Sequence, residues 1–381
     1  MRQLINRFTR VTSTGSYLPE IDGLRFLAIS WVFVYHLNDF LIQSYHGNET
    51  KIFQQILGNG HLGVELFFVI SGFVLSLPFA KYYFKQGNKV SLKQYFLRRL
   101  TRLEPPYFLI MIFLFLFLSA THLHTAKELT PHLFASLLYI HNIIYPGTLP
   151  VINSVAWSLE IEIQFYIMVP LLARIFILQK KNRRIVLSAI ILVMPVMQFF
   201  FKSDTLFFYQ FLQYFVAGFL LCDLYMNNDK QHFYRPSNNG QKKLFTLLGM
   251  LLFAGILIVH STRNDLLYTI FIPLAILLFY CIVLFIPFWN KVFSAKWINI
   301  IGGMSYTIYL IHVPIIATFG RFFVNRGIMN NYLTYFIIQS FIWGPLILFA
   351  GSIFFYFIER PCMKKDWYVR FYKNKVNKKK I

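Results

Sequence analysis

Charged residues are scarce in this sequence of 381 residues, and acidic residues are the scarcest. Asp, Glu, Lys and Arg make up 14% of the chain, with only 15 acidic residues among them. A soluble globular domain carries about 25% charged residues. Hydrophobic residues make up 57%, including 44 Phe and 23 Tyr. The composition therefore excludes a soluble enzyme and a disordered chain, and it predicts a polytopic helical membrane protein.

Cysteine is also scarce. The three cysteines, Cys222, Cys281 and Cys362, lie far apart and form no Cys-x-x-Cys pair. They favour neither a disulfide framework nor a zinc site, and we expect no metal. No small-residue cleavage site precedes the first apolar run, so we expect this run to be retained rather than removed as a signal peptide.

Long apolar runs account for most of the chain. A bilayer core needs about 20 apolar residues per helix, and this rule predicts an all-α bundle of about ten transmembrane helices. The runs lie near residues 23–42, 62–80, 106–121, 156–178, 184–201, 207–226, 243–260, 266–288, 301–323 and 332–358. A shorter run near 132–145, next to Pro131, is typical of a re-entrant or interfacial segment.

The distribution of basic residues predicts the orientation of the bundle. The net charge is +22, yet the loops on one side of the membrane hold only six basic residues: Lys51, Lys127, Lys202, Arg263, Arg321 and Arg326. This bias indicates that both termini are cytoplasmic, and it explains the charge without nucleic acid. We expect a cytoplasmic segment at 1–22, a membrane domain at 23–358 and a basic cytoplasmic tail at 359–381. The run Lys373–Lys380 is typical of a solvated, lipid-facing segment.

Ionisable residues inside apolar spans are costly and are functional candidates. They are Arg25, His36, Glu65, Glu160, Glu162, Asp223 and His312. Arg25 and His36 are eleven residues apart, which places them on one helical face about 16 Å apart along the axis. Arg25 lies at the cytoplasmic end and His36 in the outer half. The alternative roles are an interfacial anchor for Arg25 and a packing role for His36.

Three further groups of polar residues are candidates. The third span begins with Arg98, Arg99 and Arg102, a guanidinium cluster that suits phosphate, although ordinary membrane anchoring would also explain it. Glu160 and Glu162 are about 200° apart on a helix, so one face cannot present both. Ser305, Tyr309 and His312 recur at intervals of four and three residues and form a polar stripe.

Taken in order, these motifs resemble the integral-membrane acyltransferase type 3 family. The matches run from residue 21 to residue 361 and are Ile21-Asp22-Gly23-Leu24-Arg25 with His36; Gly63-Val64-Glu65-Leu66-Phe67-Phe68 with Ser71-Gly72-Phe73; Arg99 and Arg102 with Pro105 and Tyr107; Trp157-Ser158-Leu159 with Glu162, Phe165 and Tyr166; Ser305-Tyr306 with Tyr309-Leu310 and His312; and Glu359-Arg360-Pro361. Two positions depart from the family pattern: Glu65 stands where many members have Asp, and Pro105-Pro106 doubles a single Pro.

The resemblance implies a membrane-bound O-acyltransferase. Such an enzyme moves an acetyl or other short acyl group from cytoplasmic acyl-CoA to a hydroxyl of a cell-surface or exported glycan, for example an O-antigen. With the residue chemistry, it indicates His36 as general base, with Glu162 or Glu65 orienting its other ring nitrogen; acylation of His36 itself is the alternative. The donor would be held by Arg25, Arg98, Arg99, Arg102 and Tyr107. The acceptor side would be lined by Trp157, Ser305, Tyr306, Tyr309 and His312.

The expected co-substrate is acetyl-CoA or another acyl-CoA. The expected partners are a glycan or lipid-linked oligosaccharide acceptor and the lipid bilayer of a bacterial inner membrane, and a homodimer is left open. A secondary transporter and a non-catalytic glycan or lipid export subunit are the rival functions. A transporter of this kind is commonly built from two halves with paired, interrupted helices, and the sequence shows no internal repeat.

Overall fold

The computed structural model describes residues 10, 17–44, 51–201, 203–227, 238–259, 265–323, 331–364 and 367. Within these ranges every regular element is a helix, and no strand occurs. Most of the expected terminal segments 1–22 and 359–381, including Lys373–Lys380, lie outside the described residues, as do Lys202, Arg263 and Arg326. The all-helical fold class is therefore established for the part of the chain that forms the bundle.

The helices follow the apolar runs of the sequence. In chain order they are α2 (Pro19–Ser44), α3 (Lys51–Gly58), η1 (Asn59–Leu62), α4 (Gly63–Tyr83), α5 (Leu92–Ala120), α6 (Ala126–Leu137), α7 (His141–Ile144), α8 (Ala156–Leu172), η2 (Ala173–Ile177), α9 (Lys180–Phe200), η3 (Phe208–Phe211), α10 (Leu212–Met226), α11 (Asn239–Ile258), α12 (Leu266–Phe285), α13 (Pro287–Phe293), α14 (Lys296–Gly303), α15 (Ser305–Phe323), α16 (Tyr332–Phe354), η4 (Phe355–Glu359) and α17 (Arg360–Cys362). The short run near 132–145 forms the end of α6 and all of α7.

Seven described helices are long and apolar enough to cross a membrane, or eight if α14 and α15 form one bent span. The count of ten remains a prediction, although each of the ten apolar runs falls on a helix. Two of these helices are short: α8 has 17 residues and α10 has 15. The apolar run continues past each of them as a 3₁₀ segment, η2 after α8 and η3 before α10. A tighter turn interrupts the straight helix there, and sequence hydropathy does not register it.

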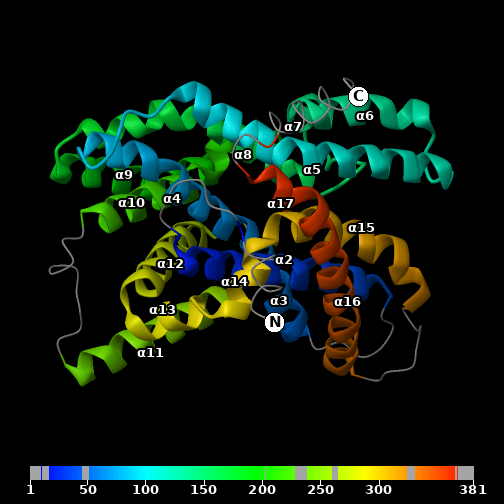
Figure 1. Cartoon of the computed structure of the whole chain (residues 1–381). Helices are drawn as coiled ribbons and strands as arrows, with labels where there is room; N and C mark the ends of the chain where they lie inside the picture. The colour runs from blue at the N-terminus through cyan, green and yellow to red at the C-terminus, as the bar shows by residue number, and fades with distance from the viewer. Residues whose placement is uncertain are drawn as a thin grey trace, which may run out of the picture.

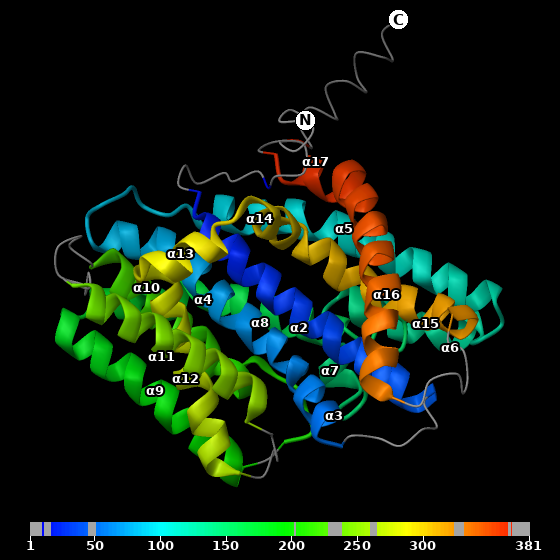
Figure 2. The same cartoon turned by 90° about the horizontal axis from the view of Figure 1, so that it is seen from below.

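Helix α2 lies in the middle of the molecule (Figures 1 and 2). It packs along α4 and α14 and also contacts α15. The approach of α14 is close because Gly302 has no side chain: a Cβ there would stand 1.7 Å from the carbonyl oxygen of Asp22. The beginning of α2, which carries Asp22 and Arg25, is thereby fixed against α14.

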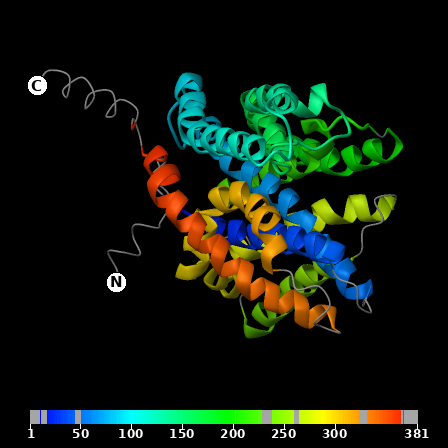
Figure 3. The same ribbon diagram turned by 90° about the vertical axis from the view of Figure 1, so that its right-hand side faces the viewer.

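Two groups of helices flank this centre. Figure 2 shows α9 to α13 on one side of α2, and α15 and α16 on the other; Figure 3 shows the same molecule from the end. Helix α10 of the first group approaches α4 closely, because a Cβ on Gly218 would lie 2.3 Å from the carbonyl oxygen of Val69. Small residues permit this kind of contact between membrane helices. Asp223 of α10 is fully buried and is neutralised by Arg183 and Arg184 of α9, at 2.5 and 2.6 Å.

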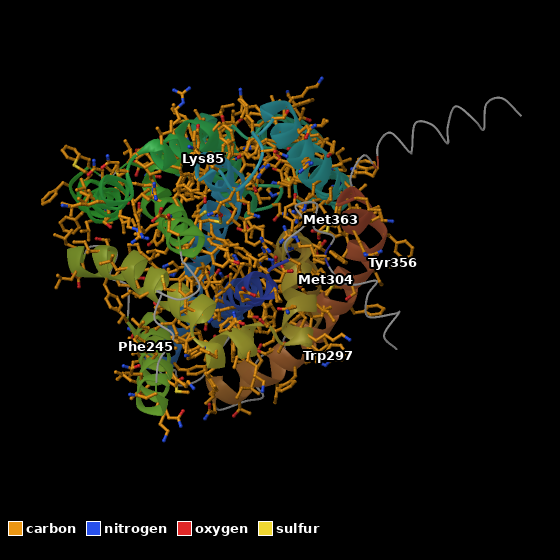
Figure 4. All side chains as sticks on the ribbon, turned by 60° about the vertical axis from the view of Figure 1, so that its left-hand side comes forward. Lys85, Phe245, Trp297, Met304, Tyr356 and Met363 are labelled. Atoms are coloured by element: carbon orange, nitrogen blue, oxygen red, sulfur yellow. The ribbon has the colours of Figure 1, made fainter. Side chains whose placement is uncertain are left out.

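The chain bends by 67° between α14 and α15. Met304 lies at this bend, and its sulfur accepts a hydrogen bond from Ser352 Oγ of α16 at 3.8 Å. Figure 4 marks Met304, together with Tyr356 in η4 and Met363 just after α17. Just after α16 the backbone forms the π-helix η4, which ends at the buried Glu359. The motifs at residues 305–312 and 359–361 meet here, because Glu359 accepts hydrogen bonds from Thr307.

Candidate active site

Four arginines gather near the beginning of α2, and we call them the arginine cluster: Arg10, Arg25, Arg99 and Arg102. Their common anchor is Asp22, which is 2% exposed. Asp22 Oδ1 accepts hydrogen bonds from Arg25 Nη1 at 2.5 Å and from Arg10 Nη1 at 3.2 Å. Arg102, on α5, lies in the electrostatic field of both Arg10 and Arg25. Residues far apart in the sequence thus form one positively charged site.

Two further carboxylates balance part of this charge. Glu162 of α8 interacts electrostatically with Arg25 and Arg99. Glu359 of η4 interacts with Arg102, and its Oε2 accepts hydrogen bonds from the backbone N and Oγ1 of Thr307 at 3.2 and 2.5 Å. The arginine cluster of four guanidinium groups therefore has three carboxylates, and one positive charge is left over. Such a surplus suits an anionic ligand.

Arg102 is the member best placed to bind that ligand. No ion pair or hydrogen bond joins it to another described residue, and its Nε is buried without a partner. Arg99 is more constrained, because its Nη1 donates to the carbonyl oxygen of Tyr95 at 2.9 Å and its guanidinium lies 3.7 Å from the centre of the Tyr95 ring. A buried, unpaired guanidinium nitrogen is costly unless something binds it. The guanidinium group of Arg102 is therefore the one with most hydrogen-bond donors left to bind an anion.

Two residues expected to bind the donor lie elsewhere. Arg98, one turn before Arg102, is exposed. Tyr107 is 1% exposed and packs against α6: its hydroxyl donates to the carbonyl oxygen of Ser136 at 3.0 Å, and its ring stacks on Tyr139. Of the five residues predicted for the donor, the structure brings together Arg25, Arg99 and Arg102.

His36 lies against a second histidine. Its ring centre is 5.1 Å from that of His312 on α15, and 5.0 Å from that of its neighbour Tyr35. Among the described residues it has no hydrogen bond to Glu162 or Glu65, the two carboxylates expected to orient it. Glu162 instead accepts hydrogen bonds from Ser71 Oγ and Tyr166 Oη, both at 2.5 Å. The sequence predicts a carboxylate beside His36, and in the structure the imidazole ring of His312 lies beside it.

The residues expected on the acceptor side separate into two places. Tyr309 shares a hydrogen bond with Ser158 Oγ at 2.5 Å, and Tyr306 donates to the carbonyl oxygen of Leu103 at 2.8 Å. Ser305 and His312 are buried on the same helix, α15. Trp157 instead packs on Phe211 of η3, with ring centres 5.6 Å apart. The polar stripe of α15 is thus buried, whereas Trp157 of α8 packs against η3.

Glu160 and Glu162 serve different places, as their angular separation predicted. Both carboxylate oxygens of Glu160 lie 3.1 Å from the backbone N of Asn142, and this carboxylate also accepts from the backbone of His141. Glu160 therefore holds the beginning of α7, where unpaired backbone N–H groups need acceptors. Glu162 alone reaches the arginine cluster.

Sequence reasoning missed three members of the site: Arg10, Asp22 and Glu359. Asp22 could have been found, since it precedes Arg25 by three residues and shares its helical face. Glu359 depends on the π-helix and on the fold of two distant segments. Among the described residues no group of three His, Cys, Asp or Glu side chains is placed to hold a metal ion.

Comparison with known proteins gives this arrangement its context. A family model described as an acyltransferase domain matches residues 18–358. The peptidoglycan O-acetyltransferase OatA of Listeria monocytogenes is 26% identical over 390 aligned positions, which cover 94% of this chain and 57% of that protein. The O-acetyltransferase OatA of Staphylococcus aureus is 27% identical over 384 positions, which cover 92% of this chain and 58% of that protein. The chain thus spans less than two thirds of the length of these curated relatives. No solved structure matches it.

Proposed function

The chain belongs to the integral-membrane acyltransferase type 3 family, and from that premise we propose that it is an acyl-CoA-dependent O-acetyltransferase of a glycan. The acceptor is a hydroxyl of a cell-surface or exported glycan, and the name of the Listeria relative makes peptidoglycan the first to test. The observation that carries the proposal is the arginine cluster with its unpaired Arg102. The proposed location is the bacterial cytoplasmic membrane, with both termini in the cytoplasm.

The arginine cluster is the proposed binding site for the phosphates of acetyl-CoA. Guanidinium groups bind phosphate through paired, charge-assisted hydrogen bonds. In this proposal Arg102 supplies free donors, while Asp22 holds Arg25 in place. The cluster lies near the beginning of α2, and the excess of basic residues on the same side supports a cytoplasmic location for that end. Acetyl-CoA is a cytoplasmic metabolite, so donor and site would be on one side of the membrane.

His36 is the proposed general base. It lies about 16 Å along α2 from Arg25, a distance that suits the long pantetheine arm of the donor. A hydroxyl is a weak nucleophile until a base removes its proton. In the proposed step the proton passes to His36, the acceptor oxygen bonds to the acyl carbon and the carbon–sulfur bond breaks. The leaving thiolate then takes the proton, so that the products are the O-acetyl glycan and coenzyme A.

Label transfer in vesicles tests the proposal. The full chain is reconstituted in lipid vesicles with acetyl-labelled acetyl-CoA and peptidoglycan fragments or a lipid-linked glycan fraction. The comparison is between His36→Ala and the matched control His61→Ala. His61 is also half-buried, but its Nδ1 contacts only the carbonyl oxygen of Gly58, at 3.0 Å.

We expect wild type and His61→Ala to label the glycan. His36→Ala should bind acetyl-CoA with unchanged affinity and transfer nothing. Turnover at the wild-type rate by His36→Ala would contradict the role of the base. A wild-type protein that fails to bind acetyl-CoA would contradict the role of the arginine cluster.

A further inference from the structure

We propose that His312, rather than a carboxylate, orients His36 by accepting a hydrogen bond from its ring N–H. This inference rests on the proposed function and deepens it, because it names the residue that makes His36 a base. His312 acts through His36 and is therefore a positioning residue. Three observations carry the inference: the tautomer of His312, the position of its second nitrogen and a matching histidine pair elsewhere in the same molecule.

The hydrogen bonds of His312 determine its tautomer. Its Nδ1 lies 3.0 Å from the carbonyl oxygen of Ile308 and 2.8 Å from that of Tyr309. Carbonyl oxygens only accept hydrogen bonds, so Nδ1 must carry the hydrogen. In the neutral ring Nε2 then presents a lone pair. The backbone of α15 thus turns His312 into a fixed hydrogen-bond acceptor.

The Nε2 atom of His312 is buried and has no hydrogen-bond partner among the described residues. A buried polar atom without a partner is rare and calls for one. The His36 ring is close enough to supply it, with its centre 5.1 Å away. The nearby Tyr309 hydroxyl is already engaged with Ser158 and with the carbonyl oxygen of Val155. The ring N–H of His36 is therefore the donor that we assign to Nε2 of His312.

A second histidine pair in this protein shows that the spacing is sufficient. Nδ1 of His132 and Nε2 of His141 are hydrogen-bonded at 3.0 Å, with ring centres 5.2 Å apart. The centres of His36 and His312 are 5.1 Å apart, at an interplanar angle of 55°. The two pairs have nearly the same ring spacing, so the distance between His36 and His312 is compatible with a hydrogen bond between a nitrogen of His36 and Nε2 of His312.

This pairing has a chemical consequence. When one nitrogen of His36 donates to His312, the other must present its lone pair to the acceptor hydroxyl. After proton transfer, the His36 imidazolium keeps a charge-assisted hydrogen bond to a neutral partner. A neutral partner holds the proton less firmly than a carboxylate would, so the proton can return to the leaving thiolate. His312 remains neutral throughout, and the atoms and charges balance as in the proposed transfer.

Two substitutions separate this role from packing. His312→Asn keeps an amide N–H near the position of Nδ1, and so keeps the contact with the carbonyls of Ile308 and Tyr309, but offers nothing at the position of Nε2. His312→Gln places an amide oxygen near the position of Nε2. Losing one charge-assisted hydrogen bond corresponds to about a 10- to 100-fold effect. We expect kcat for acetyl transfer to fall by about this factor in His312→Asn and by less in His312→Gln, with the Kd for acetyl-CoA unchanged in both.

A second readout does not depend on activity. Solid-state NMR of protein labelled with ¹⁵N-histidine, in lipid bilayers, should show a cross peak between the N–H of His36 and Nε2 of His312. The peak should vanish in His312→Asn. The hydrogen-bonded pair His132 and His141 provides the positive control in the same spectrum.

The outcomes are distinct. If the control peak appears and the wild-type peak between His36 and His312 does not, the inference is overturned, whatever the activity. Wild-type kcat in His312→Asn would also overturn it, as would equal losses in the Asn and Gln variants. If the peak is present in a wild-type protein that transfers no acetyl group, the proposed function fails while the pairing of the two rings stands.

Discussion

The contact between α14 and α2 at Gly302 gives a sharp prediction. In Gly302→Ala the new methyl carbon would stand 1.7 Å from the carbonyl oxygen of Asp22 and 2.9 Å from the backbone nitrogen of Phe26. Real Cβ atoms essentially never come within 3.0 Å of such an atom, so the two helices must separate by about 1.3 Å. The obstacle is backbone rather than a flexible side chain, so the cost should be near the upper end of the overpacking range, about 3 kcal/mol.

Gly255→Ala is the matched control. Gly255 is also a helical glycine in an apolar span, in α11, but the nearest atom that its Cβ would meet outside its own helix is Cζ of Phe271 at 3.8 Å, an ordinary van der Waals contact. Alanine has the higher helix propensity, so this variant should be unchanged or more stable by up to about 1 kcal/mol. Thermal unfolding of the purified proteins in one detergent, followed by tryptophan fluorescence, compares the two. Equal melting temperatures for the two variants would refute the close approach of α14 and α2.

The same substitution tests how the arginine cluster is held. Asp22 anchors Arg25 and Arg10, and its backbone is what Gly302→Ala displaces. We therefore expect the folded fraction of Gly302→Ala to bind acetyl-CoA more weakly than Gly255→Ala does. Binding of equal strength, measured by titration calorimetry on folded protein, would mean that the position of Asp22 does not control the donor site.

Two further predictions follow from the site. Arg102→Ala should raise the Kd for acetyl-CoA by about 10- to 100-fold, because it removes a charge-assisted hydrogen bond worth about 1.5–3 kcal/mol. Arg98→Ala, on the exposed face of α5 one turn away, should change this Kd less than about twofold. Equal effects of the two substitutions in calorimetry would contradict the assignment of Arg102, and not Arg98, to the donor site. Glu160→Gln should expose the beginning of α7, because an amide has only one acceptor oxygen for the N–H groups of His141 and Asn142. Hydrogen exchange at these two amides should then rise, and unchanged exchange would contradict the capping role.

The sequence predicted the helices well, because the apolar runs that stabilise them are local. It predicted their count less well, since the 3₁₀ segments η2 and η3 and the bend at Met304 leave hydropathy unchanged. Helical periodicity also separated Glu160 from Glu162 correctly. The same arithmetic applied to Arg102 and Tyr107, five residues apart, gives about 140° and would have placed them on different faces. The family motif predicts Tyr107 at the donor site, but the order of residues in a motif does not say toward which side of the helix each side chain points.

Other parts of the site could not be predicted from spacing. Arg98 and Arg102 share a helical face at a separation of four residues, yet only Arg102 is covered by neighbouring helices. The spacing of two residues gives the angle between their side chains around the helix axis. It does not say how far the neighbouring helices extend along that axis. The pairing of His36 with His312 joins α2 to α15, and it depends on packing between helices that are almost three hundred residues apart in the chain.

The π-helix η4 makes the C-terminal motif depend on how many residues precede it as well as on which residues they are. Each residue of an α-helix turns the chain by about 100°, and a π-helical turn accommodates one residue more than an α-helical turn. That extra residue sets the rotational phase of Glu359 relative to α16, so that its carboxylate meets Thr307 and the field of Arg102. If the same residues formed a regular α-helix, the extra residue would add about 100° of rotation and turn the Glu359 carboxylate away from Thr307. The direction of the Glu359 side chain therefore depends on the backbone form of this segment as well as on its residues.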